Sequence, residues 1–214
     1  MSDEQLSEPV KAGRPKAAEA EARLLDLMDT AANLILEKGY SKVSLELIAR
    51  EARVAVRTIY VKFGGKEGLF KAILQRRRGQ MFDSMEKLED TQRPMRDALL
   101  DFGLRLHSML SAPAASALYQ IIIAEAHANP GLAEAFFDAG PRLTREMLAR
   151  YFAREDVRAQ LRVEVAPERL AIHLINCIMG DQLKLFLFES RCAAPTNQHQ
   201  VEEGIDLFLH GVLR

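Results

Sequence analysis

The chain has 214 residues, of which 48% are hydrophobic and 28% charged, and its formal net charge is −1 at pH 7. These values are typical of an ordinary globular protein with enough material for one large or two small domains, and the overall charge gives no indication about its partners. The only cysteines, Cys177 and Cys192, exclude a disulfide framework and a CxxC metal motif, which suits a reducing, cytoplasmic location.

The first 16 residues are polar and contain Pro9, Gly13 and Pro15. They cannot bury enough apolar surface to fold, so residues 1–16 are predicted to form a disordered basic arm without an apolar signal region. Residues 17–38 are predicted to form the first helix, because apolar side chains recur there at 3.6-residue spacing before Gly39. These apolar residues are Leu24, Leu27, Met28, Ala31, Leu34 and Ile35.

Two short segments with apolar side chains at helical spacing follow, at residues 45–52 and 56–63. Ser44 precedes the first segment at the N-cap position, where its hydroxyl can accept a hydrogen bond from a free backbone N–H. Val43 and Ile48 occupy the two positions of a hydrophobic staple. With only a few residues between them, the segments are predicted to form a helix-turn-helix at about residues 44–63, within a three-helix head that spans residues 17–65.

The second of these helices has one side suited to binding. Ile59 and Phe63 lie one turn apart and should face inward. The outer side then carries Val56, Arg57, Tyr60, and Val61 or Lys62. An arginine, a tyrosine and a lysine on one face suit phosphates and base edges. From spacing alone, a small helical hairpin with a solvated charged face is an equally good interpretation.

The distribution of charge is uneven. Between Lys38 and Arg78 there are eleven basic and three acidic residues, so the rest of the chain is acidic. A basic head on an acidic body is typical of a DNA-binding module with a separate second function. Three consecutive arginines, Arg76, Arg77 and Arg78, fall inside a predicted helix that starts at Lys66, where we expect them to form part of a solvated face.

From Lys66 onward the pattern is helical, and most breaks coincide with proline or glycine. The predicted helices cover residues 66 to about 89, 95–110, 114–128, 132–139, 142–154, 167 to about 189, and 198–213, of which 132–139 and 142–154 could form one kinked helix. No sheet is predicted. The apolar stretch at residues 170–188 is interrupted by polar side chains, so it is poorly suited to spanning a bilayer.

Few residues suggest other chemistry. Glu125, His127 and His173 could be taken for a metal or acid/base site, but Glu125 and His127 lie about 200° apart around a helix. Zinc sites also need three or four ligands at recognisable spacing. The GGKEG segment lacks the first glycine and the Ser/Thr of a phosphate-binding loop. No enzymatic activity, metal or cofactor is therefore expected.

Residues 44–70 resemble the DNA-binding signature of the TetR/AcrR family of transcriptional regulators. The matching landmarks are the capping Ser44, Ile48-Ala49, Thr58-Ile59-Tyr60, Phe63, Lys66-Glu67 and Leu69-Phe70. Two residues depart from the family pattern. Arg53 stands where the turn usually has glycine, and Ala55 stands where the recognition helix usually begins with serine. Arg53 would be strained in a left-handed conformation, and Ala55 cannot provide a side-chain cap.

This resemblance implies an all-α fold, with a helix-turn-helix head followed by a helical ligand-binding and dimerisation domain at residues 66–214. It also implies a homodimeric repressor that binds palindromic operator DNA and is released by a small molecule. Phosphate contacts would come from Ser44, Thr58, Tyr60 and Lys66, and base contacts from Val56 and Arg57, with Lys62 on the same outer face. Arg14 in the arm could lie in a minor groove, or the arm could contact nothing.

The resemblance also places a ligand cavity among the middle helices, although apolar side chains at helical spacing are more often plain core. The predicted cavity residues are His107, Tyr119, Ile123, His127, Phe137, Met147 and Met179. The last two helices carry more apolar surface than one core stripe needs, which suggests a dimer interface if these residues are not buried within one subunit. The predicted interface residues are Leu174, Ile178, Leu185, Phe188, Ile205, Phe208 and Leu209. Alternatively, the protein is a helical small-molecule-binding protein or an enzyme without a DNA function.

Overall fold

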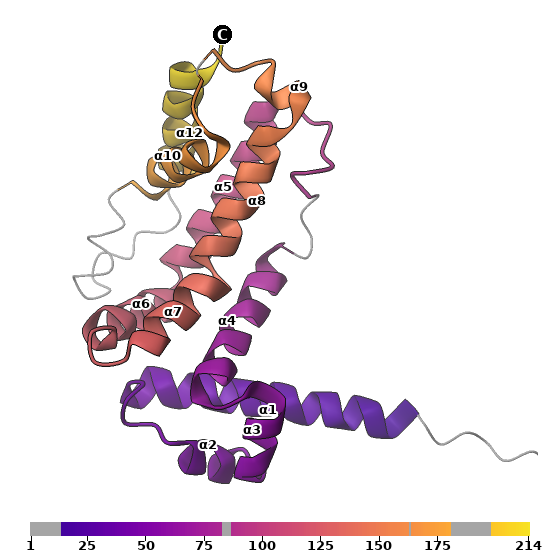
Figure 1. The fold of residues 1–214 in the computed structure, drawn as a ribbon, viewed down its shortest axis with the longest axis vertical. Coiled ribbons are helices and arrows are strands. Elements are labelled where there is room, and N and C mark those ends of the chain that lie inside the picture. Colours follow the sequence, from indigo (N-terminus) through magenta and orange to yellow (C-terminus); the bar gives the residue numbers. More distant parts are fainter. Residues whose placement is uncertain (1–13, 83–86, 163, 181–197) are drawn as a thin grey trace, which may run out of the picture.

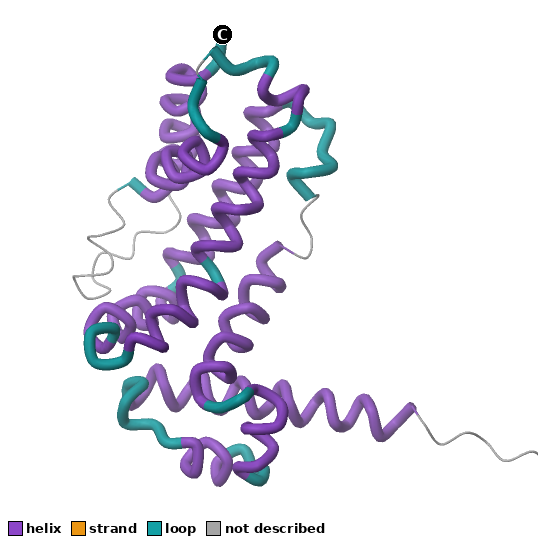
Figure 2. The backbone as a smooth tube through the Cα atoms, in the orientation of Figure 1, coloured by secondary structure: helices purple, strands orange, loops and turns teal. Residues whose placement is uncertain are grey.

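The computed structural model describes residues 14–82, 87–162, 164–180 and 198–214, and in these ranges it is helical (Figures 1 and 2). The only strand-like feature in them is an isolated antiparallel bridge between Leu161 and Leu213. The helices are α1 (Arg14–Lys38), α2 (Leu45–Glu51), α3 (Val56–Phe63), α4 (Lys66–Phe82), α5 (Met95–Ser111), α6 (Pro113–Glu125), α7 (Pro130–Ala139), α8 (Pro141–Ala153), α9 (Glu155–Arg158), α10 (Pro167–Met179) and α12 (Gln198–Val212). The predicted all-α fold is confirmed.

Helices α1 to α3 form a head, and α4 rises from it to run beside the body (Figure 1). Helices α5 and α8 form the long axis of the body, α10 and α12 lie beside them, and α6 and α7 lie at the end nearest the head. Among the described residues, no single helix is long and apolar enough to cross a membrane. Helices α5 and α6 reach that length and composition only as a pair, and they are bent by 68° at their junction.

Helix α1 begins earlier than the sequence suggested. The disordered arm was predicted to reach residue 16, but the helix already includes Arg14 to Lys16. Pro15 permits this start, because proline is well tolerated in the first turn of a helix and good helix formers follow it. Residues 1–13 of the predicted arm lie outside the described residues.

The helix-turn-helix forms as its local signals predicted. The hydroxyl of Ser44 accepts a hydrogen bond from Leu47 N at 3.1 Å, and Val43 and Ile48 are fully buried as a staple requires. Arg53 in the turn has φ of +55°, and no other non-glycine residue in the described ranges has a positive φ. Ala55 precedes α3 without a side-chain cap. The two departures from the family pattern therefore have structural consequences, a left-handed backbone at Arg53 and an uncapped start of α3.

Two hydrophobic cores divide the chain differently from the predicted boundary at residue 66. One core lies in the body among α5, α8, α10 and α12. The other fills the head, but it also takes in the first part of α4 together with Leu118 and Ile122 of α6 and Leu132 and Ala135 of α7. Helices α6 and α7 therefore pack against the head as well as against the body.

Five residues that were predicted for the dimer interface are buried inside one subunit instead. Leu174, Ile178 and Ile205 are completely buried inside one subunit, and Phe208 and Leu209 are each only 5% exposed. Their apolar surface serves the body core, where α10 and α12 pack so tightly that a Cβ on Gly204 would lie 2.2 Å from the Cys177 carbonyl oxygen. The remaining two residues of that prediction, Leu185 and Phe188, lie outside the described residues.

Candidate functional site

The outer face of α3 is open to solvent. Arg57 and Lys62 are exposed, and Tyr60 and Val61 are 56% and 70% exposed. Ile59 is fully buried beneath them, so it fixes the orientation of the helix on the head. Together these residues present a basic and partly aromatic surface that a groove of DNA could accept.

Three other predicted DNA contacts are less available. Val56 packs partly against the head core, and Thr58 is half-buried. The Ser44 hydroxyl is already engaged in capping α2, and its hydrogen bond to Glu46 also helps to lower the pKa of that carboxyl, after the larger effect of the Glu46 backbone N–H. Arg14 lies at the start of α1.

Lys66 has internal partners. Its ammonium group donates a hydrogen bond to the Tyr40 carbonyl and lies 4.0 Å from the centre of the Tyr40 ring. Burial lowers the pKa of Lys66, while the charges of Glu125 and Glu67 act in the opposite direction. This lysine therefore fastens the start of α4 to the loop after α1, which leaves its charge poorly placed for a phosphate.

The same loop is held by the end of α6. The Glu125 carboxylate accepts a hydrogen bond from the Ser41 backbone N–H at 2.7 Å and another from the Ser41 hydroxyl. The side-chain amide of Asn129 also donates to that hydroxyl, at 3.0 Å. The Glu125 side chain lies so close to the loop that a Cβ on Gly39 would be 2.9 Å from its carboxylate oxygen. Glu125, considered above for a metal or acid/base site, instead joins the body to the head.

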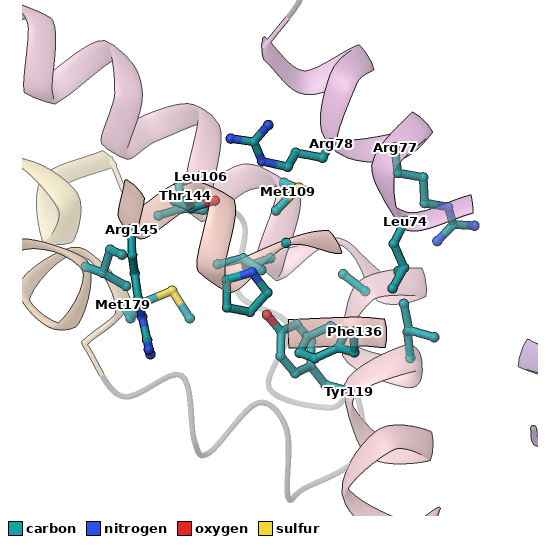
Figure 3. Close-up of a pocket in the computed structure, with 16 residues that line it drawn as sticks. Leu74, Arg77, Arg78, Leu106, Met109, Tyr119, Phe136, Thr144, Arg145 and Met179 are labelled. Carbon is teal, nitrogen blue, oxygen red and sulfur yellow. The ribbon is translucent and has the colours of Figure 1, made fainter. Parts of the chain in front are cut away.

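A cavity of about 260 Å³ lies between α4 and the body (Figure 3). Its volume is near the lower end of the range for small-molecule sites, about 300–1,000 Å³. Most of the wall is apolar, and its polar groups come from three arginines, a tyrosine and a threonine. The lining residues are Leu74, Arg77 and Arg78 of α4, Leu106, Met109 and Leu110 of α5, Ala115, Leu118 and Tyr119 of α6, Phe136 of α7, Gly140, Pro141, Thr144 and Arg145 at and within α8, and Ile175 and Met179 of α10.

Two of the seven predicted cavity residues, Tyr119 and Met179, lie in this wall. Burial raises the pKa of Tyr119 to about 12, which favours the neutral phenol even more strongly than usual. The ring packs edge-on against Phe136 at 5.1 Å between centroids. These residues make one end of the cavity aromatic.

The other five predicted cavity residues lie elsewhere. His107 is buried beside Ser111, with 3.3 Å between Nδ1 and the hydroxyl, and burial lowers its pKa. The last residue of α6 in the cavity wall is Tyr119, and Ile123, one turn later, is exposed to solvent. His127 is also exposed and lies beyond the end of that helix. The two remaining residues are Phe137, which is 40% exposed on the outside of α7, and Met147, which packs against the body core.

The arginines of the wall were not predicted. The sequence suggested a solvated face for Arg76, Arg77 and Arg78. In the structure Arg76 pairs with Asp29 at 2.7 Å, whereas Arg77 and Arg78 belong to the cavity wall. Three consecutive residues span about 200° of a helix, so they cannot all face the same solvent. This helical geometry predicts, from the sequence alone, that at least one of the three arginines faces the body. No comparable signal identified Arg145 or Thr144, which tertiary packing brings to the wall.

Within the described ranges, no group of three histidine, cysteine or acidic side chains lies close enough together to hold a metal ion. The features that remain are an exposed recognition helix and an apolar cavity beside the helix that carries the head. This combination is that of a one-component transcriptional regulator.

Two family comparisons agree with this class. Residues 27–73 match the family described as bacterial regulatory proteins, tetR family, and residues 97–211 match the AefR-like transcriptional repressor C-terminal domain. The second match alone covers more than half of the 214 residues. The chain therefore belongs to the TetR family, with a C-terminal domain of the AefR-like kind.

Two curated relatives match part of the chain. The chain is 32% identical over 65 residues to the fatty acid metabolism regulator protein of Bacillus subtilis, and the match covers 30% of this chain and 34% of that protein. It is 38% identical over 64 residues to the HTH-type transcriptional repressor ComR of Escherichia coli, which covers 30% of this chain and 29% of that protein. Each alignment thus spans about a third of the relative.

Solved structures extend the likeness to the whole fold. A TetR-family regulator from Mesorhizobium loti has a TM-score of 0.70 at 23% identity, covering 91% of this chain and 98% of that one. NalD of Pseudomonas aeruginosa, the secondary repressor of the MexAB-OprM multidrug efflux pump, has a TM-score of 0.64 at 25% identity, covering 92% and 98%. These likenesses support the arrangement of head and body described above.

Proposed function

We propose that the protein is a homodimeric transcriptional repressor that binds a palindromic operator through α3 and releases it when a small molecule fills the cavity. The observation that carries this proposal is the position of the cavity. Its wall includes α4 and α6, and both helices also contribute to the core of the head. A ligand that binds one arrangement of these helices better than another would shift the position of the heads. Such a regulator acts where bacterial DNA lies, in the cytoplasm.

DNA contact would centre on Arg57, with Tyr60 and Lys62 beside it on the exposed face of α3. The guanidinium fork of Arg57 suits a guanine edge, while a tyrosine hydroxyl and a lysine suit phosphates. Phosphate contacts from Ser44 and Thr58 depend on how closely the head approaches the duplex, since both side chains are exposed or half-exposed. Two heads related by a twofold axis would bind two half-sites about one helical turn apart.

The dimer would use the outward faces of α10 and α12, because their inward faces are already buried. Leu207 on α12 is 69% exposed and Ile172 on α10 is 38% exposed, so both side chains are available to a partner subunit. Pairing these faces across a twofold axis would form an intermolecular bundle of four helices.

A retardation assay on the DNA upstream of the protein's own coding region tests the proposal. We expect a discrete complex that survives excess unrelated DNA. If the protein retarded all DNA equally, or none, the proposed repressor function would be wrong, and a small-molecule-binding protein without a DNA function would be the better interpretation.

A further inference from the structure

The arginines around the cavity differ from the other arginines of the body. Most of those others have an anionic partner: Arg96 pairs with Asp206, Arg150 with Glu89 and Arg154 with Asp156. In the described part of the chain, Arg77, Arg78 and Arg145 have no ion pair, and no acidic residue lines the cavity. The cavity is therefore apolar with an excess of positive charge.

Arg78 is the most constrained of the three. Its side chain extends from α4 toward the α5 and α8 side of the cavity (Figure 3), and its guanidinium lies 4.9 Å from the centre of the Phe82 ring. Among the described residues, its Nε is the one buried side-chain nitrogen or oxygen without a hydrogen-bond partner. Burial lowers the pKa of Arg78, and the like charge of Arg150 lowers it further. Within the described ranges, this half-buried guanidinium therefore has no anion beside it, although such groups normally have one.

The other two arginines are placed differently. Arg145 is exposed, lies beside Met179 and stacks on Phe137 at 5.3 Å, whereas the guanidinium of Arg77 turns away from the cavity (Figure 3). Arg78 is therefore the best-placed donor for a bound anion, and Arg145 adds positive potential near Met179. Between them, Leu106, Met109 and Phe136 would contact an apolar body.

We propose that the ligand of this cavity is an amphipathic organic anion, with an apolar chain or ring system and one carboxylate-like group bound by Arg78. This inference rests on the proposed function for its regulatory meaning, since it names the class of effector. The apolar part would lie along Met109, Phe136 and Met179, and the carboxylate would accept the hydrogen bonds that Arg78 lacks. A neutral or cationic molecule of the same shape would leave the guanidinium unpaired and would bind more weakly.

Isothermal titration calorimetry with three ten-carbon probes tests the charge preference directly. Decanoate, decanol and decylamine share an apolar chain and carry negative, zero and positive charge at pH 7. We expect decanoate to bind at least about tenfold more tightly than decanol, because a hydrogen bond is about twice as strong when it is charge-assisted, and decylamine to bind most weakly. Equal affinity for decanoate and decanol would overturn the proposal.

The variant Arg78→Met keeps an apolar stem of similar length and removes the cation. It should bind decanoate and decanol about equally, whereas Arg169→Met, on the exposed side of α10 and outside the cavity wall, should keep the preference. Because Arg78 has no ion pair with any described residue, Arg78→Met should melt at the same temperature as the parent or higher. Unchanged discrimination in a folded Arg78→Met protein would exclude Arg78 as the anion site.

The two proposals can fail separately. Preference for decanoate in a protein that retards no specific DNA would retain the ligand class and reject the repressor function. Specific retardation by a protein that does not distinguish the three probes would retain the repressor and reject the ligand class.

Discussion

At the scale of single residues, we expect Arg57 on the exposed recognition helix to contribute to DNA binding and Lys66, which has internal partners, not to contribute. Arg57→Ala should weaken operator binding by about 1–3 kcal/mol and relax preference at one base position, because the guanidinium can bond two acceptors of one guanine. Fluorescence anisotropy with a set of operators that differ by single bases measures both the loss of affinity and the change in base preference. Equal loss on every sequence would show that Arg57 contacts phosphate only.

Lys66→Met is the matched control in the same head. Its ammonium is already bonded to the Tyr40 carbonyl and lies over the Tyr40 ring. We therefore expect the slope of log affinity against log salt to stay the same, and the head to become less stable. A slope that decreases by about one would restore the phosphate contact that the family resemblance implies for Lys66.

A substitution at Arg53 measures how much the left-handed backbone in the turn between α2 and α3 destabilises the fold. With φ of +55° Arg53 occupies a conformation that glycine adopts freely and other residues adopt at a cost of about 1–2 kcal/mol. After allowance for the flexibility of glycine in the unfolded chain, Arg53→Gly should raise the free energy of unfolding by about 0.5–1 kcal/mol. Urea unfolding measures this change. Arg23→Gly, at an exposed position inside α1, should instead lower it by about 1 kcal/mol. A loss of stability in Arg53→Gly would mean that the arginine makes a stabilising contact that outweighs the strain.

At the scale of elements, we propose that the junction between α6 and the loop after α1 carries the effect of the ligand from the cavity to the head. The Glu125 carboxylate holds Ser41 by two hydrogen bonds, and α6 also lines the cavity. Glu125→Gln keeps the shape but removes the charge, which should weaken both bonds. We expect effector-induced loss of operator affinity to fall by about tenfold, within the usual size of allosteric coupling.

The measurement is operator affinity with and without saturating effector, compared with Glu134→Gln at an exposed position on α7. The control should respond like the parent. If Glu125→Gln also responded like the parent, the signal would have to pass through α4 alone.

The elements also show where sequence reasoning succeeds and where it stops. The bounds of α3 and α5 and the start of α4 were predicted to within a residue, because caps, prolines and apolar spacing are local signals. The roles of α10 and α12 were not, because periodicity reveals an apolar stripe without showing which neighbour covers it. Leu174 and Ile205 were assigned to a dimer and lie in the core. Likewise, the residues of the cavity wall depend on how α4 and α8 are placed in the folded chain, and local sequence patterns do not predict that placement.

At the scale of the whole molecule, the dimer can be tested at its remaining exposed face. Leu207→Glu would place a charge in the proposed interface and should shift the protein to monomers at micromolar concentration, as measured by sedimentation equilibrium. Ile123→Glu, at a 52% exposed position on α6, should leave the dimer intact. A parent protein that is monomeric, or a Leu207→Glu variant that stays dimeric, would show that α12 does not form the interface in this way.

The basic head, the junction between Glu125 and Ser41, and the cavity support the proposal of a regulator whose central activity is sequence-specific binding to DNA by two heads. Selection of binding sites from random duplex DNA by the purified protein tests this most directly. The account predicts enrichment of an inverted repeat with two half-sites about one helical turn apart, and loss of one base preference in each half-site with Arg57→Ala. Enrichment of no sequence, or of a single half-site without a symmetric partner, would contradict it.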